Sequence, residues 1–234
     1  MNQREKMFSA YHPSIYSQSN VFTEEEYEDS FHQYELSFGK DLPSGKDAHI
    51  LDIGCGGGHF LYFLKKKGYT NYLGIDLSSE AIEMVRERIT TRVEQGDAFC
   101  FLRSHGDDYD AICSSDMIEH IPKDRVLDFL SLAYSALKPN GVLLLRLPNM
   151  GNPFALHNRY RDFTHECGYT EKSIYQILYI CGFRNIHVRP DQITGKKNLK
   201  SFLSGIVSKV IYAIIKKLFW YQGYTAPDIL ASRM

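Results

Sequence analysis

The chain of 234 residues is long enough for one α/β domain with a sizeable buried core. Its formal net charge of −1 gives no excess of positive charge for binding nucleic acid, so we expect no nucleic-acid partner. Five cysteines without a CxxC pair predict reduced thiols in a cytoplasmic protein, and we expect no signal peptide.

Residues 1–45 predict an N-terminal helical cap. Thr23 followed by Glu26 is typical of a helix start, in which the threonine caps the first turn. Aromatic residues then recur at helical spacing, at Tyr27, Phe31, Tyr34 and Phe38. We favour a helix packed on the domain, and the alternative is that Tyr11, Tyr16 or Tyr27 closes over a bound molecule.

From residue 48 onward, strands and helices alternate. A short apolar run and three closely spaced glycines predict a buried parallel strand that turns tightly into a helix. The run is Ile50, Leu51 and Ile53, and the glycines are Gly54, Gly56 and Gly58. The first amides of that helix point at the space beside the turn, so the stretch predicts a cradle for a nucleotide-type ligand.

Polar residues follow the next strands. Asp76 ends the second strand, where an acid can accept hydrogen bonds from ribose hydroxyls. In the alternative, Asp76 only starts a turn, and Ser78 or Ser79 caps the next helix. Gly96-Asp97-Ala98 follows the third strand.

The run Leu51–Gly58, with Asp52 two residues ahead of the first glycine, closely resembles the first motif of the class I S-adenosylmethionine (SAM) dependent methyltransferases. The resemblance covers about residues 48–190, and it includes Gly96-Asp97-Ala98, similar to the adenine-binding corner of that family. A dinucleotide enzyme is disfavoured, because His59 stands where the third glycine of its motif belongs.

This resemblance implies a Rossmann-like α/β fold with a mostly parallel seven-stranded sheet, helices on both faces, and SAM as cofactor. The residues it assigns to the cofactor are Asp52, Gly54, Gly56, Gly58, Asp76, Leu77, Asp97, Ala98 and Ser114. The SAM-binding core is expected over residues 46–195, with a substrate loop at 148–168.

Candidate catalytic residues lie after the fourth strand and in the substrate loop. A hydroxyl acceptor benefits from a base, and His120 and His165 are placed to act as one, with Asp162 to orient a histidine. In the alternative, both histidines only hold the local backbone. Asp116 and Glu119 could gather with these side chains around a metal, but no compact ligand spacing is present, so we expect no metal.

The substrate loop also contains Arg159, Tyr160 and Arg161, which we assign to substrate binding. Paired arginines suit a phosphate or carboxylate. They could also form ion pairs on the surface.

After the core, residues 196–224 predict an amphipathic helical insertion, and residues 225–234 predict the final strand of the sheet. Lysines interrupt the apolar residues of the segment 198–221, which suits either peripheral contact with a membrane or packing on protein. The first alternative would place the chain at the inner face of the cell membrane.

A second resemblance is to methyltransferases of bacterial surface-polysaccharide (O-antigen or capsule) clusters. It rests on the motif Arg-Asp-x-Thr-His, which is followed along the chain by a capped helix and then by Cys-Gly-Phe. This implies O-methylation of a sugar hydroxyl in a surface polysaccharide or its nucleotide- or lipid-linked precursor. The alternatives are a small-metabolite methyltransferase, acting on a quinone precursor or an amine, and a catalytically silent SAM-binding regulator. The oligomeric state stays open.

Overall fold

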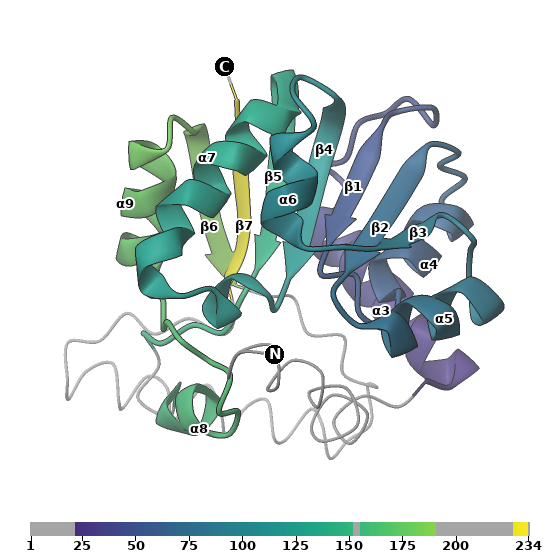
Figure 1. The fold of residues 1–234 in the computed structure, drawn as a ribbon, viewed down its shortest axis with the longest axis horizontal. Coiled ribbons are helices and arrows are strands. Elements are labelled where there is room, and N and C mark those ends of the chain that lie inside the picture. The colour runs from purple at the N-terminus through teal and green to yellow at the C-terminus, as the bar shows by residue number, and fades with distance from the viewer. Residues whose placement is uncertain (1–21, 152–154, 191–226, 234) are drawn as a thin grey trace.

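The computed structural model describes residues 22–151, 155–190 and 227–233, which form one sheet with helices on both faces (Figure 1). The strands are β1 (Ile50–Ile53), β2 (Tyr72–Asp76), β3 (Val93–Gln95), β4 (Tyr109–Ser115), β5 (Leu137–Arg146), β6 (Arg184–Pro190) and β7 (Pro227–Ser232). The α-helices are α3 (Glu24–Phe38), α4 (His59–Lys66), α5 (Ser79–Arg88), α6 (Ala98–Arg103), α7 (Val126–Ala136), α8 (Ala155–Tyr160) and α9 (Glu171–Ile180). Two short 3-10 helices, η2 (Ile118–His120) and η3 (Lys123–Arg125), follow β4.

The seven strands lie in the order β3-β2-β1-β4-β5-β7-β6. All pairs among β1 to β5 are parallel, whereas β7 runs antiparallel between β5 and β6. The carboxyl ends of the parallel strands therefore meet at one edge, the lower edge in Figure 1, where α8 also lies. The Rossmann-like α/β fold with a mostly parallel sheet is confirmed, and β7 falls within the residues expected to form the last strand.

Successive residues of the central strands face opposite layers of helices. Ile50 of β1 packs with apolar residues of α3, α4 and α5, whereas Leu51 and Ile53 pack with those of α6, α7 and α9. In β4, Ala111 faces the same helix layer as Ile50, and Ile112 faces the same layer as Leu51 and Ile53. Because side chains alternate across a strand, continuous apolar runs are needed to bury both faces.

The N-terminal helix α3 begins as predicted, since the Thr23 side chain accepts a hydrogen bond from the Glu26 amide at 3.3 Å. Its aromatic face packs against α4, with the Tyr34 and Phe60 ring centroids 5.2 Å apart. Tyr27 is buried and donates its hydroxyl to the Gly57 carbonyl at 2.8 Å. The helix is therefore packed on the domain, and Tyr27 takes part in that packing. Tyr11 and Tyr16 lie outside the described residues.

The expected substrate loop is described over residues 148–151 and 155–168, and this part has more regular structure than its lack of periodicity predicts. It contains the short helix α8, and its end is tied to η2, because the amides of Glu166 and Cys167 donate to the Glu119 carbonyl at 2.8 and 3.0 Å. The Met150 amide donates to the Tyr169 carbonyl at 2.7 Å. These bonds fix the segment against the edge of the sheet.

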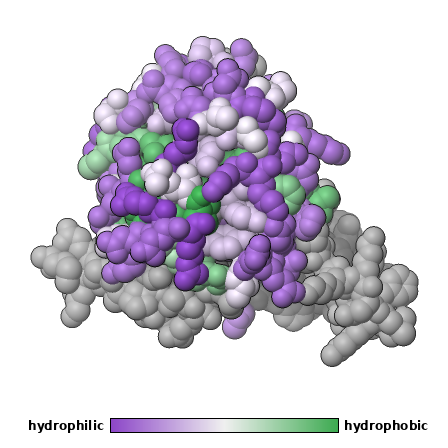
Figure 2. Space-filling view, turned by 90° about the vertical axis from the view of Figure 1, so that its right-hand side faces the viewer, coloured by the Kyte–Doolittle hydropathy of each residue, from purple (hydrophilic) through white to green (hydrophobic). Residues whose placement is uncertain are grey.

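The segment 198–221 lies outside the described residues, so the choice between membrane contact and packing on protein stays a prediction. No helix in the described part of the chain is long and apolar enough to cross a membrane. On the side of α5 and β3, the described surface is mostly hydrophilic with scattered small apolar areas (Figure 2).

Two glycines with left-handed backbone allow a direct test of how α4 is packed. Gly58, before α4, has φ +75°, and Gly68, after it, has φ +80°. Alanine at either position should cost about 1 kcal/mol of unfolding free energy for the left-handed conformation. At Gly58 the added methyl would also lie 2.8 Å from Ile89 Cδ1 and 2.9 Å from Val85 Cγ2, whereas at Gly68 no atom lies within 4 Å.

We therefore expect Gly58→Ala to lose about 1–3 kcal/mol more than Gly68→Ala in urea unfolding. Equal losses in the two variants would contradict the close packing of α4 against α5.

Candidate active site

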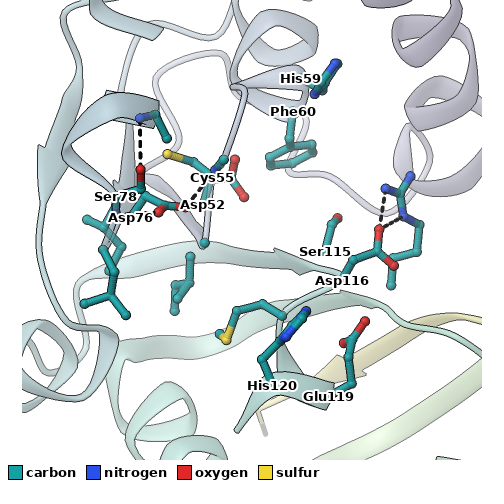
Figure 3. Close-up of a pocket in the computed structure, with 18 of the residues that line it drawn as sticks. Asp52, Cys55, His59, Phe60, Asp76, Ser78, Ser115, Asp116, Glu119 and His120 are labelled. Carbon is teal, nitrogen blue, oxygen red and sulfur yellow. Dashed lines mark hydrogen bonds and ion pairs between the residues drawn. The ribbon is translucent and has the colours of Figure 1, made fainter. Parts of the chain in front are cut away.

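A cavity of about 660 Å³ lies at the carboxyl edge of the sheet (Figure 3). Asp52, Cys55 and Asp76 lie on one side of it, and Glu119 and His120 lie across from them. The sequence-predicted site residues that line it are Asp52, Gly54, Gly56, Asp76, Leu77, Ala98, His120, Arg161, Asp162 and His165. Ligands of open α/β sheets bind at this edge.

The Asp76 carboxylate organises the first wall of the cavity. One of its oxygens accepts a hydrogen bond from the Gly56 amide and the other from the Ser78 amide, both at 2.9 Å. Ser78 in turn caps α5 by accepting from the Ala81 amide at 3.2 Å. The interpretation of Asp76 as the start of a turn before a capped helix is therefore confirmed, and its role toward ribose hydroxyls stays a prediction.

Asp52 is a buried acid at the base of the same wall, with 3% of its surface exposed. Burial, and then the charge of Asp76, raises the pKa of Asp52 to about 8, against the opposing effect of Arg146. A positively charged ligand in the cavity would stabilise the ionised carboxylate.

Three predicted cofactor residues shape the backbone and do not appear in the cavity wall. Gly58 precedes α4 in a left-handed conformation. The Asp97 carboxylate caps α6 by accepting from the Phe99 and Cys100 amides, both at 3.0 Å. The buried Ser114 hydroxyl donates to the Ile53 carbonyl at 3.0 Å, which joins β4 to β1. A direct role of these three in cofactor binding stays a prediction.

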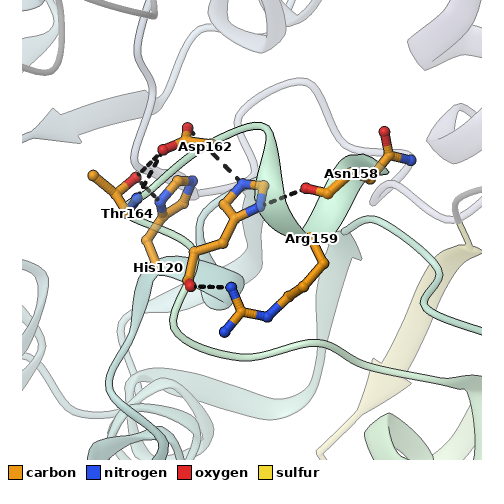
Figure 4. Close-up of polar contacts among 6 residues, drawn as sticks. His120, Asn158, Arg159, Asp162 and Thr164 are labelled. Carbon is orange, nitrogen blue, oxygen red and sulfur yellow. Dashed lines mark hydrogen bonds and ion pairs between the residues drawn. The ribbon is translucent and has the colours of Figure 1, made fainter. Parts of the chain in front are cut away.

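A hydrogen-bonded network fixes the two histidines on the opposite wall (Figure 4). The Thr164 hydroxyl donates to Asp162 Oδ1 at 2.7 Å, so it accepts at 2.8 Å from His120 Nδ1. His165 Nδ1 lies 2.8 Å from the Asn158 carbonyl, which can only accept. Both rings therefore carry their proton on Nδ1, and in the neutral form each has its lone pair on Nε2.

Burial also controls the charges on this wall. It lowers the pKa of His120, and the neighbouring His165 adds to the effect. Burial, together with the charge of Asp116, raises the pKa of Glu119 well above its usual range. For Asp162, burial acts against ionisation, but the hydrogen bonds from Thr164 prevail and lower the pKa of Asp162. The wall thus combines neutral imidazole with an ionised carboxylate.

The three predicted substrate residues have different environments in the structure, and their roles toward a substrate stay predictions. The Arg159 guanidinium donates to the backbone carbonyls of His165 and Glu166, so it holds the loop. Tyr160 is 74% exposed and does not line the cavity. Arg161 alone of the three lines the cavity, and the expected arginine pair is therefore not formed there.

Several residues that line the cavity were not predicted from the sequence. Arg146 ends β5 and forms an ion pair with Asp116, with Nη2 2.7 Å from Oδ2, and its guanidinium lies 5.3 Å from the Tyr34 ring centroid. The Tyr34 hydroxyl donates to Ser115 Oγ at 3.3 Å. The position of Arg146 at the carboxyl end of a parallel strand could have identified it. Tyr34 gave no signal beyond its place on the aromatic face of α3.

The fold and the cavity define an α/β domain that binds a nucleotide-like ligand beyond its first strand. A family model described as "Methyltransferase domain" matches residues 19–188, so the chain belongs to that family. The structure is similar to that of a SAM-dependent methyltransferase from Archaeoglobus fulgidus, at 26% identity and a TM-score of 0.67, covering 90% of this chain and 97% of that one. The chain thus carries a SAM-dependent methyltransferase domain.

Two curated relatives have more specific names. The chain is 30% identical over 109 residues to the ubiquinone biosynthesis O-methyltransferase of Actinobacillus pleuropneumoniae, covering 43% of this chain and 45% of the relative. It is 26% identical over 156 residues to the phosphoethanolamine N-methyltransferase of Plasmodium falciparum, covering 62% and 57%. The chain spans about half the length of these relatives.

The Asp76 contacts predict a loss of cofactor affinity on substitution. Asp76→Ala removes the acceptor for the Gly56 and Ser78 amides and for a ligand hydroxyl. We expect S-adenosylhomocysteine to bind at least about tenfold more weakly by calorimetry, because one hydrogen bond to a charged group contributes about 1.5–3 kcal/mol. Asp124→Ala, which removes an exposed carboxylate of η3, is the matched control. Unchanged affinity in Asp76→Ala would contradict this role.

The raised pKa of Asp52 predicts a pH-dependent stability. Between the ordinary carboxyl pKa of 3.8 and the raised pKa of about 8, the folded protein holds a proton on Asp52 that the unfolded chain has lost. The free energy of unfolding should therefore fall as pH rises through this window. In Asp52→Asn that fall should be smaller by more than about 1 kcal/mol between pH 5 and 8.5, measured by urea unfolding without ligand. Parallel pH profiles of the two proteins would refute the assignment.

Proposed function

We propose that the chain transfers the methyl group of SAM to a hydroxyl group of a small-molecule acceptor. The observation that carries this proposal is the continuity of the cavity, which extends from the glycine turn at Gly54 and Gly56 to the histidines His120 and His165. The first end suits the methyl donor, and the second presents two imidazoles to an acceptor.

The chemistry is an in-line displacement at the methyl carbon. The acceptor oxygen forms a bond to that carbon while the carbon–sulfur bond breaks, and the electron pair of the broken bond remains on sulfur. Positioning of the two reactants supplies much of the rate. A hydroxyl must also lose its proton, and an Nε2 lone pair on His120 or His165 can accept it.

The histidine network favours a hydroxyl acceptor over an amine. A neutral amine already has a nucleophilic lone pair, whereas a hydroxyl benefits from a base before or during attack. The chain from Asp162 through Thr164 orients the His120 imidazole, and burial lowers its pKa and so favours the neutral ring. Arg161, in the cavity wall, suits an acidic group on the acceptor.

The comparisons support a small acceptor better than a polysaccharide. The curated relatives are named for an O-methyltransferase of ubiquinone biosynthesis and an N-methyltransferase of phosphoethanolamine, and neither name refers to a glycan. Methylation of a sugar in a surface polysaccharide or its precursor stays a prediction from the sequence. Residence in the cytoplasm at the inner membrane face is likewise untested.

Labelled methyl donor and a panel of small acceptors test the proposal. The panel contains phenols and catechols, amines such as phosphoethanolamine, and nucleotide-linked sugars. We expect label in the hydroxyl acceptors, and a loss of about 10²–10⁴-fold in kcat for His120→Gln or His165→Gln, with unchanged affinity for S-adenosylhomocysteine. His187→Gln, on the exposed side of β6, is the matched control.

Transfer to amines alone would overturn the choice of acceptor. Tight binding of S-adenosylhomocysteine without transfer to any member of an extended acceptor panel would favour the silent SAM-binding regulator.

A further inference from the structure

Glu119, His120 and His165 form a compact buried cluster at the acceptor end of the cavity. One ligand atom from each residue lies within 4.8 Å of the other two. The backbone creates this proximity: η2 carries the first two residues, and the amides of Glu166 and Cys167 donate to the Glu119 carbonyl, which holds His165 beside them.

The two imidazoles are oriented as metal ligands usually are. A ligating histidine almost always donates its other ring N–H to a carbonyl or a polar side chain, which fixes the ring and its tautomer. Here His165 donates Nδ1–H to the Asn158 carbonyl, and His120 donates to Thr164, whose hydroxyl is held by Asp162. Nε2 is therefore the ligand atom of each ring.

The third member of the cluster is a buried acid that needs a partner. Glu119 is only 2% exposed, and among the described residues its Oε2 atom has no hydrogen-bond partner. A buried carboxyl group without a partner is costly, and coordination of a cation offsets that cost. Asp162 Oδ2, 4.0 Å from His165 Nε2, adds a second carboxylate at the border of the same space.

In contrast to the sequence-based expectation of no metal, we propose that Glu119, His120 and His165 bind a divalent first-row transition cation. Two imidazoles and one carboxylate suit Mn²⁺, Fe²⁺ or Zn²⁺ and leave open coordination positions, whereas Mg²⁺ prefers oxygen ligands throughout. A cation about 2.1 Å from each ligand separates any two of them by at most about 4.2 Å, so binding draws the cluster together by several tenths of an ångström.

The open positions give the cation a role that rests on the proposed function. They face the cavity and suit the hydroxyl oxygen of the acceptor. A cation lowers the pKa of a bound hydroxyl, so its proton passes to water before the oxygen attacks the methyl carbon. With the cation bound, the imidazoles are ligands and do not take the proton themselves.

Direct measurement of cation binding tests the site separately from methyl transfer. The full chain is stripped with EDTA, dialysed and titrated with Mn²⁺ in the absence of donor and acceptor, followed by calorimetry and by the loss of the free Mn²⁺ electron paramagnetic resonance signal. We expect one Mn²⁺ per chain, competition by Zn²⁺, and no competition by Mg²⁺ at equal concentration. A chain that binds cation but transfers no methyl would leave this inference standing and overturn the proposed function.

Variants locate the site. Glu119→Gln and His165→Gln should each weaken Mn²⁺ binding at least tenfold. Thr164→Val, which removes the hydroxyl between Asp162 and His120 and no ligand atom, should weaken it about tenfold. Glu166→Gln and His187→Gln, both exposed, are the matched controls. Affinity for S-adenosylhomocysteine checks that each variant is folded. Absence of Mn²⁺ and Zn²⁺ binding, or equal binding by folded Glu119→Gln and His165→Gln variants, would overturn the proposal.

Discussion

The hydrogen bonds that Asp76 accepts from the Gly56 and Ser78 amides join three elements of the fold at one point. They tie the glycine turn after β1 to the end of β2 and to the start of α5. Cys55 is the one residue of the glycine turn that has a side chain, so the shape of the turn depends on such bonds from neighbouring strands. The amides of Gly54 and Cys55 add two more, to the Ile75 carbonyl at 2.9 and 3.0 Å. One wall of the cavity is consequently held by hydrogen bonds of the protein itself.

The opposite wall is constrained by electrostatics. Its acidic and imidazole groups are buried, and burial works against the charged form of each. Ionised Asp162 is stabilised by Thr164, and acceptors at Nδ1 fix the orientation and tautomer of both imidazoles. Glu119 is the exception, because no group among the described residues hydrogen-bonds its Oε2 atom. A cation bound by Glu119 and the two histidines would supply this missing partner at the acceptor end of the cavity.

The sequence predicts the first wall better than the second. Strand, glycine turn and helix are local features, so the cradle and the place of Asp76 follow from the order of residues along the chain. The capping of α6 by Asp97 is also local, but the same carboxylate cannot be assigned to a backbone cap or a ligand without coordinates. Arg159 and Arg161 show most clearly what the sequence alone does not predict. They are two residues apart, yet one binds backbone carbonyls and the other lines the cavity. The short helix α8 and the docking of its loop onto η2, neither of which has a periodic pattern, decide this difference.

The carboxyl edge of the sheet suits SAM and not a dinucleotide. Parallel calorimetric titrations of the full chain with S-adenosylhomocysteine and with NAD test this preference most directly. We expect S-adenosylhomocysteine to bind once per chain and NAD not to bind. Binding of NAD, or a folded protein with no affinity for S-adenosylhomocysteine, would contradict it.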